Sequence, residues 1–286
     1  MTARFATTVS VFMKQSKWKY RGIFAYYKEK NTYSEDVLDW IKLEVQSHLQ
    51  CTLFGLQIRS GFSNLIDPWS SGVMIYAMGD LNKYLKYSNF LDSDHFLKIK
   101  LGEDKATGAS DATVIKTKPY DHVSKQMIDS FCQTFTGDMT LPKIRHFYRP
   151  NPVIDNSVFE EEDPLAMSRK LFRETHIGFK IVPITQVRLI NFDPPYLMFY
   201  VNAMSSFQPA ALAYTLAQQF DTCAHLVDCV RTSLGPFHVN DCIRKHQLHE
   251  SEIFAAFSRH TGRYVKAVKP HLDKLRLYDE RRLFNK

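Results

Sequence analysis

The residues best suited to metal chemistry lie in one short stretch near the end of the chain. Within 27 residues the stretch holds seven thiol and imidazole side chains: Cys223, His225, Cys229, His238, Cys242, His246 and His249. On a helix, His238, Cys242 and His246 would share a face, and ligands one turn apart can bind one zinc ion. Structural zinc sites usually pair their ligands across a short knuckle, and no Cys-x2-Cys spacing occurs here. Buried thiols and exposed histidines account for the same residues, so we expect no metal site.

Candidates for acid–base chemistry are less specific. Asp92 and Asp94 with His95, or the acidic run at 160–163, could hold a cation or exchange protons, but that work requires convergent geometry. The segment GEDKATG at 102–108 has the composition of a phosphate-binding loop without its spacing. No nucleophile elbow, kinase motif set or zinc-protease helix occurs. We therefore expect no catalytic residues, no cofactor, no small-molecule substrate and no nucleotide-dependent activity.

The distribution of charge is the most informative compositional feature. The net charge is +7, yet residues 1–32 carry +6, residues 244–286 carry another +6, and the middle of the chain is acidic. Clustered basic residues attract phosphate-bearing partners, because screening confines such attraction to about 10 Å. The pattern predicts binding to nucleic acid or to an anionic membrane surface. Two solvated faces that keep the protein soluble are the alternative.

The basic N-terminal segment KQSKWKYRGIFAYYKEK, at 14–30, mixes cations with aromatic rings. Residues 5–13 and 18–27 are predicted strands joined by a polar turn. Side chains alternate along a strand, so Lys17, Lys19 and Arg21 lie on one face and the rings lie on the other. Lys17, Lys19 and Arg21 should therefore form an exposed cationic edge. We expect the segment to bind phosphate or lipid headgroups through Lys14, Lys17, Lys19, Arg21, Lys28 and Lys30, with Trp18 either anchored at the lipid interface or packed inward.

The C-terminal segment RYVKAVKPHLDKLRLYDERRLFNK has an apolar helical face flanked by cations. Membrane-surface helices and partner-binding helices share this pattern. It predicts further phosphate or lipid contacts through Lys266, Lys269, Lys274, Arg276, Arg281 and Arg282. A terminal helix that packs on its own core with its charges outward is the alternative.

The order of apolar patterns predicts an α+β fold with N-terminal strands and a helix, a central β-hairpin sheet and a helical C-terminal third. A loop is expected at 64–69, a strand running into a helix at 73–91, and a helix capped by Asp121 at 121–135. A β-hairpin is expected at 177–204, followed by helices at 209–235, 238–246, 249–260 and 263–283.

The segment RPNPVIDNSVFEEEDP is the best candidate for a domain boundary, since its prolines and acidic run disfavour a helix. It predicts a basic α+β region at 1–150, a linker at 151–175 and a hairpin followed by helices at 176–286, or one continuous domain. No window has the roughly 18 uncharged apolar residues of a membrane span. Five cysteines without a framework spacing indicate a reducing compartment, hence the cytosol or nucleus.

The order of features resembles that of rhabdovirus matrix proteins. A basic segment and a strand precede a helix that starts at Thr32–Val37, and Phe172, Arg173, Ile177 and Gly178 precede the later strands. The resemblance implies a non-enzymatic viral structural protein that self-associates and bridges ribonucleoprotein to an anionic membrane. It also implies a peripheral membrane location in the virion and in host cytoplasm or nucleus. The length, the missing PPxY motif and the helical C-terminus depart from compact animal-virus members. The length and the basicity favour a plant-infecting relative.

Two other classes of function stay open at this stage. Basic and aromatic residues in alternation also suit the stacking of single-stranded bases, as in a nucleocapsid or silencing-suppressor protein without a membrane role. An enzyme of an unrecognised family is the third class, because the absence of a known motif is weak grounds for excluding catalysis.

Overall fold

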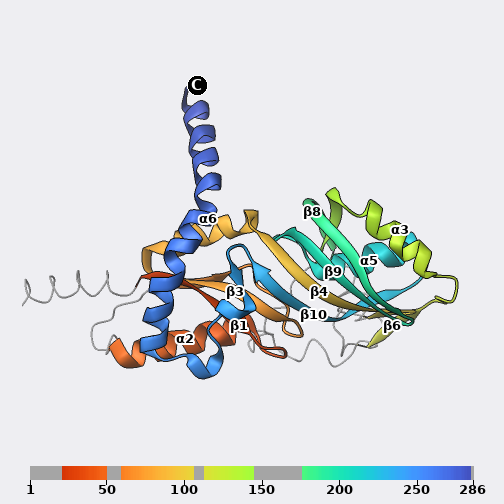
Figure 1. Cartoon of the computed structure of the whole chain (residues 1–286), viewed down its shortest axis with the longest axis horizontal. Helices are drawn as coiled ribbons and strands as arrows, with labels where there is room; N and C mark the ends of the chain where they lie inside the picture. The colour runs from red at the N-terminus through yellow and green to blue at the C-terminus, as the bar shows by residue number, and fades with distance from the viewer. Residues whose placement is uncertain (1–20, 50–58, 106–112, 145–175, 285–286) are drawn as a thin grey trace, which may run out of the picture.

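A computed structural model describes residues 21–49, 59–105, 113–144 and 176–284 of the chain (Figure 1). The predicted strand at 5–13 and the predicted linker at 151–175 lie outside these ranges, so the predicted domain boundary stays a prediction. Within the described ranges, one large mixed sheet is combined with several helices. The predicted α+β class is confirmed.

The large sheet has nine strands in the order β1-β3-β10-β4-β9-β8-β7, with β2 paired to β3 and β11 paired to β10. Neighbouring strands are antiparallel except β3 and β10, which run parallel where Gly72 lies opposite Arg231. A separate two-stranded sheet joins β5 (Glu103–Lys105) and β6 (Val114–Thr117). The strands of the large sheet are β1 (Gly22–Lys28), β2 (Ser60–Ser63), β3 (Ser71–Met78), β4 (Asp92–Leu101), β7 (Gly137–Ile144), β8 (His176–Asp193), β9 (Tyr196–Met204), β10 (Ala224–Leu234) and β11 (Phe237–His238).

The helices cover the two ends of this sheet differently (Figure 1). Helices α3 and α5 pack on one face of β4, β8, β9 and β10, while α2 and α6 pack at the β1–β3 end. Past the sheet, the C-terminal part of α6 projects away from the body. The helices are α2 (Ser34–Leu49), α3 (Lys125–Thr134), α5 (Pro209–Gln219), α6 (Glu250–Phe284) and the 3₁₀ segments η2 (Gly79–Phe90), η4 (Val239–Asp241) and η5 (Lys245–Gln247).

The burial of each strand explains its sequence pattern. All eight residues of β3 are buried, because α2 and the first turns of α6 cover one face while η2 and the middle of α6 cover the other. Its sequence SGVMIYAM is accordingly apolar without alternation. Strand β9 instead alternates buried and more exposed residues, since α3 and α5 cover only one of its faces.

The structure corrects several predicted elements. The predicted helix at 209–235 ends at Gln219; Asp221 then adopts a left-handed φ of 45°, and β10 follows in register with β4. Residues 238–246 form short 3₁₀ turns, and the two predicted helices after them are the single helix α6. Ser124 rather than Asp121 caps α3. The C-terminal third therefore contains strands as well as helices. Among the described residues, no helix combines the length and apolar character needed to cross a bilayer.

Candidate active site

A pocket of about 450 Å³ lies between the loop at 64–70, the end of η2 and the connection from β9 to α5. Strands β4, β8 and β10 contribute one or two side chains each. Its polar and charged lining residues come from segments far apart in the sequence: Asn64, Asp67, Ser70, Asn89, His95, Lys180, Ser205, Ser206, Gln208 and Arg231.

Arg231 on β10 anchors the beginning of the 64–70 loop. Its side chain is buried; Nε donates to the Val73 carbonyl at 2.7 Å and Nη2 donates to the Asn64 carbonyl at 2.6 Å. Asn64 has a left-handed φ of 51°, and its side chain forms hydrogen bonds with Ser88. Burial lowers the pKa of Arg231 to about 10, so the guanidinium stays charged at neutral pH. Arg231 thus ties the loop to β3.

Lys28, the last residue of β1, anchors the other end of the loop. It is fully buried, and Nζ donates to the carbonyls of Ser70 at 2.6 Å, Pro68 at 3.0 Å and Glu29 at 3.1 Å. Burial lowers its pKa to about 8, and the carboxylate of Asp67 acts in the opposite direction. Lys28 is therefore not exposed as the sequence predicted, because the C-terminal end of β1 lies inside the fold.

Gly72 of β3 allows strand β10 to approach closely at Arg231. Its φ is 128°, and a Cβ at this position would lie 2.2 Å from the carbonyl oxygen of Arg231. Any side chain would push β10 away from β3 or force both strands to shift. The close parallel contact that brings Arg231 to the loop therefore depends on glycine here.

Asp67 lies in the 64–70 loop, after the carbonyl that Arg231 binds and before the two loop carbonyls that Lys28 binds. Its carbonyl accepts a hydrogen bond from the Ser70 amide at 3.0 Å, which closes the turn through Pro68. Its side chain is half-buried, and among the described residues that line the pocket Asp67 supplies the one carboxylate. A carboxylate on so constrained a backbone can act as a nucleophile, as a base or as a stabiliser of developing positive charge.

His95 on β4 forms an uncharged wall of the pocket. Ser93 Oγ donates to the Ala203 carbonyl at 3.1 Å and lies 2.9 Å from His95 Nε2, so the hydroxyl accepts the Nε2 proton. Nδ1 is then the acceptor, 3.9 Å from the thiol of Cys229. The ring packs edge-on against Phe207 at a centroid distance of 5.6 Å. Burial lowers the pKa of His95 to about 3, so the imidazole is neutral at physiological pH.

Lys180 on β8 contributes a second cation to the pocket. It pairs with Leu141 of β7 in the sheet register, and its Nζ donates to the carbonyl of Ser206 in the β9–α5 connection. Burial, reinforced by repulsion from Lys143, lowers the pKa of Lys180 to about 8. The pocket therefore combines one carboxylate with a guanidinium and an ammonium group.

The cations predicted to bind phosphate or lipid do not line this pocket wherever the structure describes them. Arg21 lies 3.7 Å from Asp80 in an exposed ion pair, and Lys30 lies 3.1 Å from Asp228. The side chains of Lys266 and Lys269 on α6 are exposed. Their phosphate-binding role stays a prediction for Arg21, Lys30, Lys266 and Lys269. Outside the described part lie Lys14, Lys17, Trp18 and Lys19 and the side chains of Lys274, Arg276, Arg281 and Arg282.

The cysteine and histidine stretch does not form the helix that zinc binding would have used. His238 caps η4, Cys242 follows that turn, and His246 lies in η5, so the three residues do not share a helical face. In the part of the chain that the structure describes, no three His, Cys, Asp or Glu side chains gather as ligands for an ion. The described cysteines are free thiols: Cys132, Cys223, Cys229 and Cys242.

This region is similar to known proteins of one enzyme family. Residues 52–143, which include Asp67 and His95, match the family model described as TruB family pseudouridylate synthase (N terminal domain). The tRNA pseudouridine synthase B of Francisella tularensis subsp. novicida is 22% identical over 94% of this chain and 91% of the relative. The enzyme of the same name from Parabacteroides distasonis is 22% identical over 67% of this chain and 78% of the relative.

Solved structures share the fold. The chain matches a protein in the crystal structure of the archaeal box H/ACA sRNP Nop10-Cbf5 complex with a TM-score of 0.52 and 15% identity, covering 86% of this chain and 58% of that one. A structure of an H/ACA RNP bound to a substrate RNA containing 2′-deoxyuridine gives a TM-score of 0.52 and 15% identity, with 88% and 60% covered. The chain thus spans about three-fifths of the length of these solved proteins.

These findings overturn the resemblance to viral matrix proteins. That resemblance depended on two short segments, at 32–37 and 172–178, whereas the family match runs through 52–143 and the first relative aligns over most of the chain. The predicted matrix function, the membrane and ribonucleoprotein partners, the virion location and the prediction that the chain is not an enzyme were wrong. The relatives carry the names of RNA-modifying enzymes, so the third alternative, an enzyme of an unrecognised family, was closer.

Proposed function

We propose that the chain is a pseudouridine synthase that isomerises uridine within RNA, with Asp67 as its catalytic carboxylate. One observation carries the proposal: the carboxylate of the pocket lies inside the segment that matches the TruB family model. The curated relatives are named as tRNA pseudouridine synthases, so transfer RNA is the first substrate to test.

The reaction requires little beyond a well-placed carboxylate. The N1–C1′ bond of uridine breaks, the base turns, and a C5–C1′ bond forms; the proton on C5 is lost and N1 gains one, so atoms balance without a cofactor. Positive charge develops at C1′ as the glycosidic bond breaks, and a carboxylate beside C1′ stabilises it, as in glycoside hydrolysis. This chemistry explains why a search for phosphate loops and nucleophile elbows misses the site.

The fold supplies the rigidity that such a carboxylate needs. Arg231 holds the carbonyl of Asn64 before Asp67, and Lys28 holds the carbonyls of Pro68 and Ser70 after it. Two buried cations therefore fix the backbone on both sides of the catalytic residue. A carboxylate on a backbone fixed in advance loses less entropy when the substrate binds, which lowers the activation barrier.

The uracil ring fits the uncharged part of the same pocket. The neutral His95 ring and the Phe207 ring, packed edge-on, form an uncharged wall, and Gln208, which also lines the pocket, carries a side-chain amide of the kind that donates to uracil carbonyls. A uridine in a folded RNA reaches such a pocket only after leaving the base stack, which base-modifying enzymes commonly require. Asp67 would then lie beside the ribose of the displaced nucleotide.

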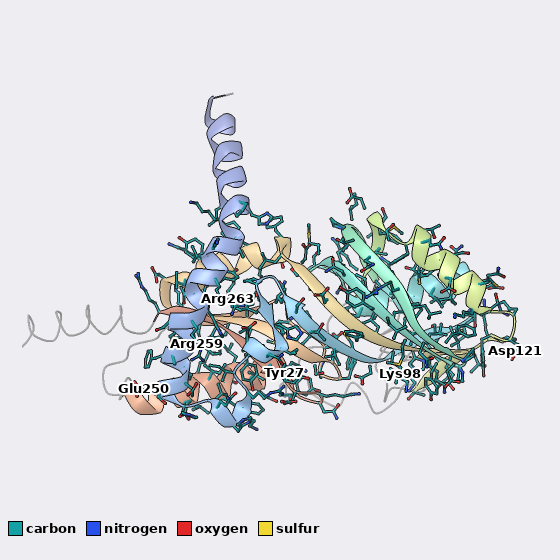
Figure 2. The ribbon with its side chains drawn as sticks, viewed as in Figure 1. Tyr27, Lys98, Asp121, Glu250, Arg259 and Arg263 are labelled. Carbon is teal, nitrogen blue, oxygen red and sulfur yellow. The ribbon has the colours of Figure 1, made fainter. Side chains whose placement is uncertain are left out.

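The decisive experiment follows the hydrogen on C5. Transfer RNA transcribed with uridine tritiated at C5 releases tritium to water when pseudouridine forms, and mass spectrometry of the digested RNA confirms the product. We expect turnover by the wild-type protein and a loss of about 10³-fold or more in Asp67→Asn, because the reacting carboxylate is removed. Asp121→Asn is the matched control: Asp121 is exposed and lies at the end of the molecule far from α6 (Figure 2). Equal activity in wild type and Asp67→Asn would refute the assignment.

A further inference from the structure

We infer that Lys180 forms a phosphate-binding subsite of the pocket and holds the phosphodiester group next to the target uridine. The inference rests on the proposed function, since it assumes that the pocket receives a nucleotide of an RNA chain. Lys180 lies on β8, more than a hundred positions from Asp67 in the sequence. Both side chains nevertheless line the same cavity of about 450 Å³.

The position of the ammonium group is fixed by the fold. Lys180 lies opposite Leu141 in the β7–β8 register, on the face of the sheet that α3 and α5 cover. Its Nζ donates to the carbonyl of Ser206, which immediately precedes the aromatic wall at Phe207. One of its three N–H donors is thus used for positioning. A lysine steered by a backbone carbonyl presents its remaining donors at a defined place.

The charge on Lys180 has no protein counter-ion in the described part of the chain. No carboxylate there forms an ion pair with its Nζ, and the neighbouring cation Lys143 repels it. A half-buried ammonium group without an anion is unfavourable, and burial lowers its pKa to about 8 as a result. An anionic ligand at this position would remove that penalty, so the site is electrostatically incomplete without one.

A phosphodiester suits this position better than the uracil base does. Uracil is neutral and offers only carbonyl dipoles, whereas each internucleotide phosphate carries a full negative charge. Any nucleotide that places its C1′ beside Asp67 brings its two flanking phosphates to the rim of the same cavity. Lysine commonly contacts nucleic-acid phosphates as a compact charge that fixes register rather than sequence. Lys180 would therefore favour polynucleotides over free uridine.

The test pairs a protein change with an RNA change. In the Asp67→Asn background, which prevents turnover, we would measure the binding of a stem-loop RNA with a single loop uridine by fluorescence anisotropy. We expect Lys180→Gln to weaken binding about tenfold, the size of a charge-assisted hydrogen bond. A neutral methylphosphonate at one of the two linkages flanking the uridine should cause a similar loss. Combined with Lys180→Gln, that linkage should cause no further loss.

The pH dependence of binding gives a second readout. Protonated Lys180 binds the phosphate, so affinity should be full well below pH 8 and should fall as the pH rises through 8 to 9.5. Lys28 titrates over the same range, Arg231 loses its charge only near pH 10, and His95 stays neutral throughout. The informative quantity is therefore the difference between variants in the loss of RNA affinity with rising pH. This loss should be smaller in Lys180→Gln than in the parent. Lys180→Arg should bind RNA as the parent does at neutral pH and should not show the loss that Lys180 causes.

The controls separate this inference from the proposed function. Lys125→Gln removes an exposed lysine of α3 that does not line the pocket, and it should bind like the parent. Thermal melting verifies that each variant is folded. Two outcomes would contradict the phosphate subsite. One is unchanged RNA affinity in Lys180→Gln; the other is a loss from Lys180→Gln that simply adds to the loss from a methylphosphonate at either linkage. Because binding is measured without turnover, the subsite can fail while pseudouridine still forms, and the reverse can also occur.

Discussion

Two regions of the molecule carry cations for opposite reasons. Around the 64–70 loop, Lys28 and Arg231 are 0% and 2% exposed, and both donate to backbone carbonyls. Along α6, Lys266 and Lys269 are exposed, and Arg263 forms a surface ion pair with Asp241 at 2.7 Å. Figure 2 shows Arg259 and Arg263 on this helix. Composition counts both groups alike, but in the described part of the chain Lys28 and Arg231 hold the pocket loop, whereas the α6 cations do not line the pocket.

Removal of a buried cation is expected to have the largest effect on stability. Arg231→Met leaves the carbonyls of Val73 and Asn64 without their donors, and each buried unsatisfied acceptor costs about 1–3 kcal/mol. We expect the free energy of unfolding, measured by urea titration, to fall by about 3 kcal/mol. Pseudouridine formation should also fall, because the loop that carries Asp67 loses its anchor.

A matched exposed arginine provides the reference for that change. Arg188 lies over the ring of Tyr200 at 4.8 Å on the open face of the sheet. Arg188→Met should cost at most about 1 kcal/mol, the value of an exposed cation–π contact. Equal losses in the two variants would show that burial does not distinguish the two groups of cations.

Much of the framework could be predicted from sequence, for physical reasons that the structure makes visible. The loop at 64–69 was predicted correctly because Asn, Asp and Pro favour turns. The strand running into a helix at 73–91 is β3 followed by η2. The helix predicted through 235 was wrong because the apolar residues within 224–234 have mixed spacing, and pairing with β4 rather than local propensity decides the conformation of this segment.

The site could not be predicted in the same way, because its residues meet only through sheet topology. Strand β10 inserts between β3 and β4, and this brings Arg231 beside a loop more than 160 positions earlier in the chain. Asp67 was recognised as part of a turn and given no chemical role. No local pattern marks Lys180 or distinguishes buried Lys28 from its exposed neighbour Lys30.

Acid should lower the free energy of unfolding through two buried histidines. Burial lowers the pKa of His95 to about 3 and that of His260 to about 4, and His260 Nδ1 accepts a hydrogen bond from the Ala25 amide at 3.2 Å. Protonation is therefore easier in the unfolded chain, where histidine titrates near 6.5. Stability should be full above pH 6.5 and fall as pH decreases, with a limiting slope of about 1.4 kcal/mol per pH unit for each histidine.

The measurement compares slopes rather than absolute stabilities. Urea titrations between pH 6.5 and 5 should show a flatter dependence for His95→Gln and His260→Gln than for the parent. His246→Gln is the control, because that side chain is exposed in η5. An unchanged slope in both buried-histidine variants would contradict the assignment of the acid sensitivity to these residues.

The smallest effect on stability is expected for the exposed cations of α6. Lys266→Glu with Lys269→Glu should change the free energy of unfolding by less than about 0.5 kcal/mol, because exposed substitutions away from packed groups rarely do more.

The same double variant tests RNA binding by α6. If Lys266 and Lys269 contact RNA phosphates, the affinity should fall for RNA of any sequence, and the salt dependence of binding should decrease by about one counterion per lost contact. That loss should not depend on which linkage flanks the target uridine, unlike the loss expected at Lys180. RNA binding identical to that of the parent at low salt would show that α6 presents a solvated face. Of the two regions compared, only the pocket would then contain cations that bind the RNA.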